Sequence, residues 1–357
     1  MASVLGTNQY GKAEVHMVTV SRDGARHTIR DLTVGIALSG DLTDVHLTGD
    51  NAHVVPTDTQ KNTVYAFAKE APVGAIEDFG LRLGRHFVAS FAPIARARVH
   101  IVEAGWERLG DHSFRQSGAE SRVATVVCDA EEAWVVSGLE GLVVLNSTDS
   151  EFEGFIEDRY TTLPATNDRV LATAGAARWR HASSSSPDWD ASCEAEESWV
   201  VSGLEGLVVL NSTDSEFEGF LEDRYTTLAE TKDRVLATAV AARWRHASAS
   251  SADWDASFGA ARGLLLDTFA TTYSTSLQGT LYAMADAMLT GRPELAEVRM
   301  SLPNRHHYVV DLSPFGLEND NEVFHADDRP YGLIEASVLA PDAPPAGPVW
   351  DPYPLVG

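Results

Sequence analysis

Apolar and polar positions alternate in several stretches of the first third of the chain, which is the period of a half-buried strand. Between these stretches apolar side chains recur at helical spacing, as at Phe79, Leu83 and Phe87. The pattern predicts the order ββααββ, with strands at 12–20, 28–39, 95–106 and 121–127 and helices at 57–69 and 76–91. Thr57 or Asp58 is the expected N-cap of the first helix.

The remainder of the chain follows a related plan. Strands are predicted at 134–145 and 169–179, and one long amphipathic helix is predicted from Phe258 to Met288. Pro293 ends that helix because proline cannot continue it. Three further strands follow at 297–302, 306–312 and 331–339. The elements together predict an α+β fold of antiparallel sheets backed by helices.

A direct tandem duplication interrupts this plan. Residues 128–192 (copy 1) align without a gap on residues 193–257 (copy 2), and 56 of the 65 pairs are identical. Two copies are too few for a solenoid, so the segment is a duplicated hairpin within a longer fold. The two cysteines, Cys128 and Cys193, occupy equivalent positions, which indicates copying and not a disulfide pair.

The duplication sets the expected boundaries. We assign residues 1–127 to a first unit, 128–192 to copy 1, 193–340 to a second unit that begins with copy 2, and 341–357 to a C-terminal tail. Removal of one copy leaves 292 residues that form two similar units. The surplus hairpin must loop out, add to a sheet edge, or replace its twin.

Composition and charge narrow the function classes. The chain has 52 acidic and 27 basic side chains and a formal net charge of −25, so it would repel nucleic acid and an anionic membrane surface. No apolar run approaches the roughly 20 residues of a membrane span, and no secretory signal is visible. We therefore expect a cytoplasmic protein without nucleic acid or membrane partners.

Several polar clusters are candidates for chemistry, although each alone is typical of ordinary structure. Lys12 lies at a strand start, and residues 57–63 form a polar helix start whose amide groups would suit an anion. Asp-Arg pairs recur at 168–169 and 233–234 and resemble strand salt bridges. The histidines of 303–307 fit an exposed turn, because a metal site would need further ligands.

Taken together and in this order, the clusters resemble the urate oxidase (uricase) family, whose members have the tunnelling fold (T-fold) and use no cofactor. The resemblance covers nearly the whole chain except one copy of the repeat. It rests on YGK at 10–12, GDN at 49–51, TDTQKNT at 57–63, LRLGRHF at 81–87, SLPNRH at 301–306 and RPYGLIEA at 329–336, and on the repeated segments NSTDSEFEGF, DRYTTL and DRVLAT.

The resemblance implies oxidation of urate by molecular oxygen to 5-hydroxyisourate and hydrogen peroxide, without metal, flavin or haem. It places a catalytic proton relay at Lys12, Thr57 and His306. A desolvated lysine loses its proton more easily and can then draw one through a threonine hydroxyl.

The same resemblance implies a set of substrate contacts. Arg234 would grip one edge of the purine ring, Gln278 would pair with the adjacent edge, and Phe217 would stack on the ring. The remaining implied contacts are the amides of Thr57 and Asp58, the backbone of Leu277, and Asn304, which would hold oxygen or water above the ring.

Copy 1 offers Phe152 and Arg169 as alternatives to Phe217 and Arg234. We favour copy 2 because it runs directly into the helix that carries Gln278. Copy 1, however, is continuous with the first unit, and a hybrid with one strand from each copy stays open.

Assembly is the last expectation. The resemblance implies a homotetramer in which two tandem T-fold units per chain close into barrels, with each active site shared between two subunits. Barrel closure also removes exposed sheet edges. The alternative hypothesis is a catalytically silent urate-binding or purine-binding T-fold protein whose assembly the extra hairpin alters.

Overall fold

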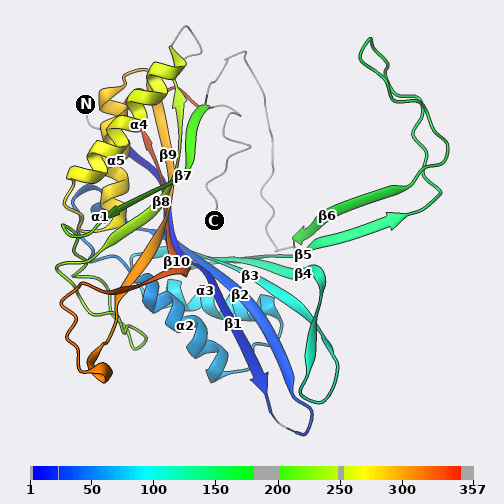
Figure 1. The fold of residues 1–357 in the computed structure, drawn as a ribbon, viewed down its shortest axis with the longest axis horizontal. Coiled ribbons are helices and arrows are strands. Elements are labelled where there is room, and N and C mark those ends of the chain that lie inside the picture. The colour runs from blue at the N-terminus through cyan, green and yellow to red at the C-terminus, as the bar shows by residue number, and fades with distance from the viewer. Residues whose placement is uncertain (1–2, 23, 181–200, 248–252, 347–357) are drawn as a thin grey trace.

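Ten strands form a single antiparallel sheet in the computed structural model, which describes residues 3–22, 24–180, 201–247 and 253–346. The strands lie in the order β6-β5-β4-β3-β2-β1-β10-β9-β8-β7 (Figure 1). The N-terminal strand β1 therefore lies beside the C-terminal strand β10, in the middle of the sheet. The predicted α+β class with an antiparallel sheet and helices is confirmed.

The first unit has the predicted arrangement with one addition. Its elements are β1 (Val4–Ser21), β2 (Thr28–Gly40), α1 (Thr43–Leu47), α2 (Thr57–Glu70), α3 (Ile76–Ser90), β3 (Ile94–Arg108) and β4 (Phe114–Cys128). The short helix α1 was not expected. The predicted apolar face of α3 is confirmed, because Phe79, Leu83 and Phe87 are fully buried.

The second half departs from the prediction at its helix and at the two strands expected at 297–302 and 306–312, because a single strand, β9, runs from Leu295 to Val309. Its elements are β5 (Ala133–Asn146), β6 (Leu171–Arg180), β7 (Val201–Asn211), β8 (Leu236–His246), α4 (Trp254–Thr271), α5 (Leu277–Gly291), β9 (Leu295–Val309), the 3-10 turn η1 (Ser313–Phe315) and β10 (Phe324–Leu339). The single helix from Phe258 to Met288 is wrong. The expected helix is interrupted before Ser276. The side chain of Ser276 accepts a hydrogen bond from the Gly279 amide and caps a new helix, α5.

The two copies of the repeat form the same hairpin at opposite ends of the sheet. Val136 pairs with Arg180 in copy 1, and the equivalent Val201 pairs with Arg245 in copy 2, with the same register shift farther along each hairpin. Strand β5 adds to the edge of β4, whereas β8 pairs with β9. The copy 1 hairpin thus adds to the edge of β4 at one end of the sheet, and the copy 2 hairpin forms the other end.

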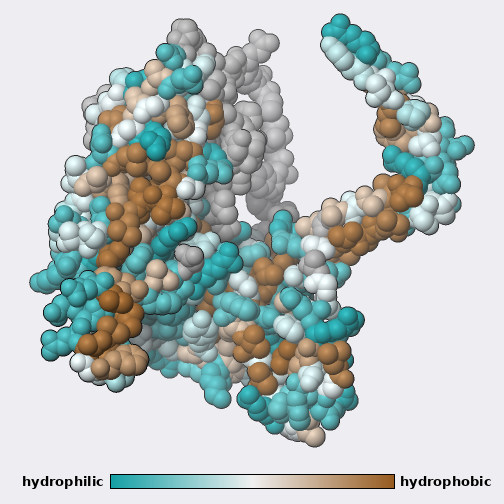
Figure 2. Space-filling view, viewed as in Figure 1, coloured by the Kyte–Doolittle hydropathy of each residue, from teal (hydrophilic) through white to brown (hydrophobic). Residues whose placement is uncertain are grey.

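The connection inside each hairpin has a different environment in the two copies. In copy 1 it extends away from the body as an arm, on which Figure 2 shows apolar patches. Tyr160 in this arm is 71% exposed, but its twin Tyr225 in copy 2 is only 8% exposed. Ile156 in copy 1 is also exposed.

Copy 2 packs on the helices of the first unit. The ring of Tyr225 contacts the rings of Phe67 and His86 at centroid distances of 6.1 and 5.7 Å. The Asn62 side chain of α2 donates to the Tyr225 carbonyl at 3.0 Å, and the Leu221 amide donates to the Val54 carbonyl at 2.9 Å. These contacts join the second half of the chain to the first.

None of the helices in the described part of the chain is both long enough and apolar enough to cross a membrane.

The twin tyrosines give a matched test of this packing. Tyr225→Ala should lower the free energy of unfolding by about 3 kcal/mol, because it removes a buried aromatic ring. Tyr160→Ala should change it by less than about 0.5 kcal/mol, because that ring is largely in solvent. Chemical denaturation of both variants measures the difference. Equal losses would contradict the docked position of copy 2.

Candidate active site

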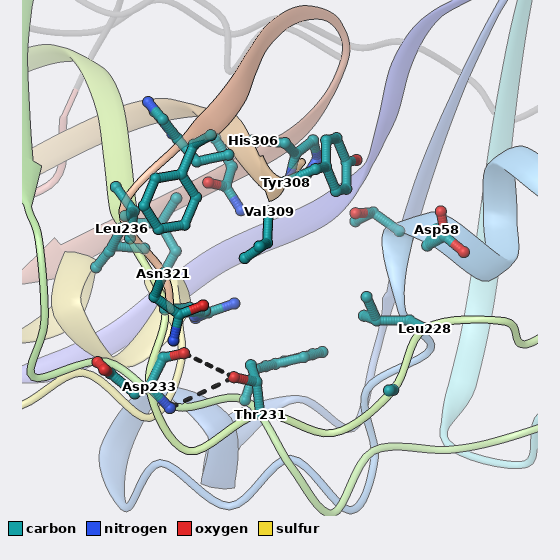
Figure 3. Close-up of a pocket in the computed structure, with 18 of the residues that line it drawn as sticks. Asp58, Leu228, Thr231, Asp233, Leu236, His306, Tyr308, Val309 and Asn321 are labelled. Atoms are coloured by element: carbon teal, nitrogen blue, oxygen red, sulfur yellow. Dashed lines mark hydrogen bonds between the residues drawn. The ribbon is translucent and has the colours of Figure 1, made fainter. Parts of the chain in front are cut away.

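A cavity of about 720 Å³ lies where the two halves of the chain meet. Side chains from β1, the start of α2, copy 2, the start of α5, β9 and β10 line it. Figure 3 shows Asp58 and Leu236 on opposite sides, with His306 and Tyr308 along a third side and Thr231 and Asp233 facing them.

The structure brings the predicted site residues together in this cavity. Its lining includes Lys12, Thr57, Asp58, Phe217, Arg234, Leu277, Gln278, Asn304 and His306. The copy 1 alternatives Phe152 and Arg169 do not line it and lie instead on the arm. One chain contributes all nine side chains, so the cavity in this structure is intramolecular. A pocket shared between two subunits stays a prediction.

Lys12 and His306 form the polar centre of the cavity. The Lys12 Nζ and the His306 Nε2 are 2.8 Å apart, and the lysine is only 1% exposed. Burial lowers the pKa of Lys12 to about 7, and the nearby positive charge of Lys61 adds to this effect. Burial, followed by the charges of Lys12 and Arg234, lowers the pKa of His306 to about 3. At neutral pH the histidine is therefore neutral, and the lysine exists in both protonation states.

Thr57 occupies a different place in its helix from the one predicted. The N-cap of α2 is Pro56, and no side chain caps the helix, so the prediction that Thr57 or Asp58 caps it is wrong. Proline offers no side-chain acceptor, and Thr57 becomes the first helical residue. Its hydroxyl faces β10, where a Cβ on Gly332 would lie 3.2 Å from the Thr57 Oγ1. Glycine therefore permits this close approach.

The Asp58 side chain ties α2 to copy 2. Its carboxylate accepts hydrogen bonds from Lys61 at 2.6 Å, Asn62 at 3.0 Å and Thr227 at 2.8 Å. Burial alone would raise the pKa of Asp58, but the hydrogen bonds from Lys61 and Thr227 bring it below its usual value. The carboxylate is thus ionised and already partnered.

Arg234 is held by residues of its own loop. Its Nε donates to the Ser215 hydroxyl at 2.9 Å, and its guanidinium carbon lies 5.1 Å from the centre of the Phe217 ring. Burial lowers the pKa of Arg234 to about 10, which still leaves it charged at neutral pH. A positive charge therefore stands beside an aromatic face at the wall of the cavity.

Copy 1 reproduces this local geometry. The Arg169 Nε donates to the Ser150 hydroxyl at 3.1 Å, and its guanidinium carbon also lies 5.1 Å from the centre of the Phe152 ring. The repeated sequence therefore specifies the arginine and phenylalanine pair in both places. Only copy 2 carries the pair into the cavity.

The remaining predicted residues come from α5 and β9. Leu277 and Gln278 are buried in the first turn of α5, directly after the capping Ser276. Asn304 lies in β9 opposite Gly332 of β10, and Gly332 lies opposite Lys12 of β1. The pairing of three strands thus places Asn304 and Lys12 at the same level of the sheet.

The sequence analysis assigned no role to three lining or neighbouring residues, Tyr10, Lys61 and Tyr308, although Tyr10 and Lys61 lie in the YGK and TDTQKNT motifs. The Tyr10 hydroxyl accepts from the Val55 amide at 2.7 Å and donates to the Val55 carbonyl at 3.2 Å, which fixes the chain just before α2. The positive charge of Lys61 helps to lower the pKa of Lys12, and the Lys61 Nζ donates a hydrogen bond to Asp58. Burial raises the pKa of Tyr308 to about 12. Periodicity offered a signal for two of them: Tyr10 lies two strand positions before Lys12, and Lys61 lies one helical turn after Asp58.

Among the described residues, no three His, Cys, Asp or Glu side chains come close enough to hold a metal ion together. The exposed turn expected at 303–307 is wrong, because these residues lie half-buried within strand β9. The Nδ1 of His307 lies 3.1 Å from the Arg305 carbonyl.

Comparisons with known proteins address the family. The family model described as "Uricase" matches residues 8–127, 135–199 and 200–335. A uricase of Arthrobacter globiformis is 43% identical over 347 residues, which are 97% of this chain and 93% of the relative. A uricase of Dictyostelium discoideum is 31% identical over 93% of this chain and 96% of the relative. The crystal structure of uricase from Arthrobacter globiformis aligns with 41% identity and a TM-score of 0.40, covering 98% of this chain and 99% of that one.

Proposed function

This chain belongs to the uricase family, and we propose that the cavity between its two halves is the place where it oxidises urate. The reaction consumes urate, molecular oxygen and water and yields 5-hydroxyisourate and hydrogen peroxide, so that atoms and electrons balance. The observation that carries the assignment of the site is the Lys12 and His306 contact in a cavity that Arg234, Phe217 and Gln278 also line.

Electrostatics in the cavity favour a planar anion. Arg234 and the protonated fraction of Lys12 are buried positive charges, whereas the carboxylate of Asp58 is already bonded to Lys61. The uncapped amides at the start of α2 add the positive end of a helix dipole. In this proposal Arg234 binds one edge of urate, Gln278 binds the adjacent edge, and the Phe217 ring stacks on the purine.

The perturbed pKa values of Lys12 and His306 support the proposed proton relay. Lys12 in its neutral form accepts a proton that the Thr57 hydroxyl takes from urate. His306, which is neutral and lies 2.8 Å from the lysine, then passes that proton to water. Asn304 holds oxygen or water above the ring. The backbone of Leu277 and the amides of Thr57 and Asp58 complete the contacts with urate.

We extend the proposal to the fold and the assembly. Strands β1–β4 with α1–α3, and β7–β10 with α4 and α5, form two T-fold units, and the β5–β6 hairpin of copy 1 is the surplus. The chain works as a cofactor-independent cytoplasmic enzyme. Its homotetramer closes the sheets into barrels, which covers their edges.

Urate turnover tests the function directly. Purified protein in air should bleach the ultraviolet absorption of urate and release one hydrogen peroxide per urate consumed. Both should persist in the presence of a metal chelator. Protein that binds urate in equilibrium dialysis but bleaches none of it would favour the alternative, a catalytically silent urate-binding protein.

The twin arginines test which copy serves the site. Arg234→Ala should lower kcat/KM for urate by about a hundredfold or more, because a desolvated charged hydrogen-bonding group is lost. Arg169→Ala removes the arginine that makes the same contacts with Phe152 and Ser150 on the arm, outside the cavity, and should leave kcat/KM nearly unchanged. The reverse pattern in steady-state kinetics would move the site to copy 1.

The pH dependence tests Lys12. Because only the neutral amine accepts a proton, kcat/KM should rise as the pH increases through about 7, the pKa to which burial lowers Lys12. Lys12→Met should lower kcat by about 10²–10⁴-fold with a smaller effect on KM and should remove this rise.

The control is Lys69→Met, which changes an exposed lysine near the end of α2 and should alter neither kcat nor KM. A Lys12→Met variant that loses urate affinity as much as kcat would assign the lysine to binding alone.

A further inference from the structure

The turn at residues 49–51 has no part in the proposed reaction, although its GDN sequence is one of the motifs of the chain. Asn51 in this turn is buried, with only 5% of its surface exposed. Its side-chain amide donates to the Glu218 carbonyl at 3.1 Å and to the Thr275 carbonyl at 3.0 Å. One side chain of the first unit therefore binds both the loop of copy 2 and the segment before α5.

Both carbonyls belong to segments that carry groups of the cavity wall. Glu218 directly follows Phe217, and Thr275 lies three residues before Gln278. An isolated β-bridge also joins the two segments to each other. The turn thus contacts the chain where the ring and the amide proposed to bind urate leave the backbone.

From these contacts we propose that Asn51 is a positioning residue, which holds Phe217 and Gln278 at the spacing that urate requires. This inference rests on the proposed function of the cavity. The Asn51 side chain does not line the cavity, so it acts through the two carbonyls and not by contact with urate.

The oxygen of the Asn51 side chain argues against a role in stability alone. This Oδ1 atom is buried and has no hydrogen-bond partner among the described residues. An unpaired buried acceptor lowers the free energy of unfolding, which opposes the gain from the two donated bonds. The side chain therefore suits the placement of two segments better than the stabilisation of the fold.

The other two residues of the motif shape the turn for this contact. Gly49 has a φ of 76°, and a Cβ at this position would overlap the hydroxyl of Thr275. The Asp50 side chain accepts a hydrogen bond from the Ala52 amide at 2.9 Å, which closes the turn. Glycine thus lets the turn approach Thr275 closely enough for Asn51 to reach its carbonyl.

The groups of the proposed proton relay are held by other contacts. The Tyr10 hydroxyl binds both the amide and the carbonyl of Val55 and so fixes the chain before α2. Lys12 and His306 are placed by the pairing of β1, β10 and β9. Loss of the Asn51 bonds should therefore disturb the binding of urate more than the chemical step.

Binding without oxygen separates these two effects. Equilibrium dialysis under nitrogen measures the Kd for urate, because no oxidation takes place. Asn51→Ala should raise this Kd about tenfold or more, since a displacement of about 1 Å can cost as much as about a hundredfold. In air, kcat at saturating urate should fall by less than about threefold, and the pH at which kcat/KM rises should not move.

The matched control is Asn211→Ala. The Asn211 side chain also donates to a backbone carbonyl, that of Phe269 at 3.0 Å, but this bond joins β7 to α4. Chemical denaturation should show a loss of stability in both asparagine variants. Only Asn51→Ala should raise the Kd, which distinguishes positioning from a general loss of stability.

A double-mutant cycle tests whether Asn51 acts through Phe217. In a chain with Phe217→Leu, the addition of Asn51→Ala should raise the Kd by a smaller factor than in the unaltered chain, because the positioned ring is already absent. Equal factors in the two backgrounds would overturn the inference. An unchanged Kd, or a kcat that falls as much as the affinity, would also overturn it.

Two further outcomes are decisive. If Asn51→Ala does not fold, Asn51→Ser takes its place, because the short serine side chain cannot reach both carbonyls, and the same results decide. An unaltered chain that binds and oxidises urate, with an Asn51 variant of equal Kd, would overturn this inference alone. An unaltered chain that neither binds nor oxidises urate would overturn the proposed function and this inference with it.

Discussion

The pairing of β1 with β10 is the constraint on which the cavity depends. Lys12 lies opposite Gly332, and Gly332 lies opposite Asn304, so three strands set the positions of residues from the two ends of the chain. The absence of a side chain on Gly332 lets Thr57 approach the same level from α2. A shift of one residue in this register would turn Lys12 to the opposite face of the sheet, away from His306. Every other feature of the cavity is arranged around this alignment.

The cavity concentrates positive charge that the protein itself does not neutralise fully. Burial of Lys12 and Arg234 costs free energy, which the lowered pKa values of both groups express. Asp58 carries a negative charge, but this charge is already paired with Lys61. In the proposed complex, a planar anion offsets this cost by direct contact with the cations. The electrostatic strain of the free cavity and its capacity for an anionic substrate therefore have the same origin.

The local sequence predicted the local structure well. It failed where long-range contacts determine the structure. The alternation and helical spacing of the first unit gave its strands and helices, and the repeat gave two hairpins of equal register. The long helix of the second half was wrong, because apolar spacing continues across Ser276 while the capping side chain interrupts the backbone. The choice between the copies could not come from local rules, since Arg169 and Arg234 adopt the same geometry on their phenylalanines.

The positions at which the copies differ explain why copy 2 occupies the packed place. Val240 is fully buried in the core, and copy 1 has Gly175 there, which would leave a cavity in the same environment. The Glu230 side chain accepts a hydrogen bond from the Gly219 amide at 2.7 Å, whereas copy 1 has Ala165 and lacks that acceptor. Copy 2 therefore has side chains that its packed position uses, and copy 1 lacks them. The copy 1 hairpin does not pack on α2 but pairs with β4, and the residues of β5 that make this pairing, apart from Ala133, are the same in both copies.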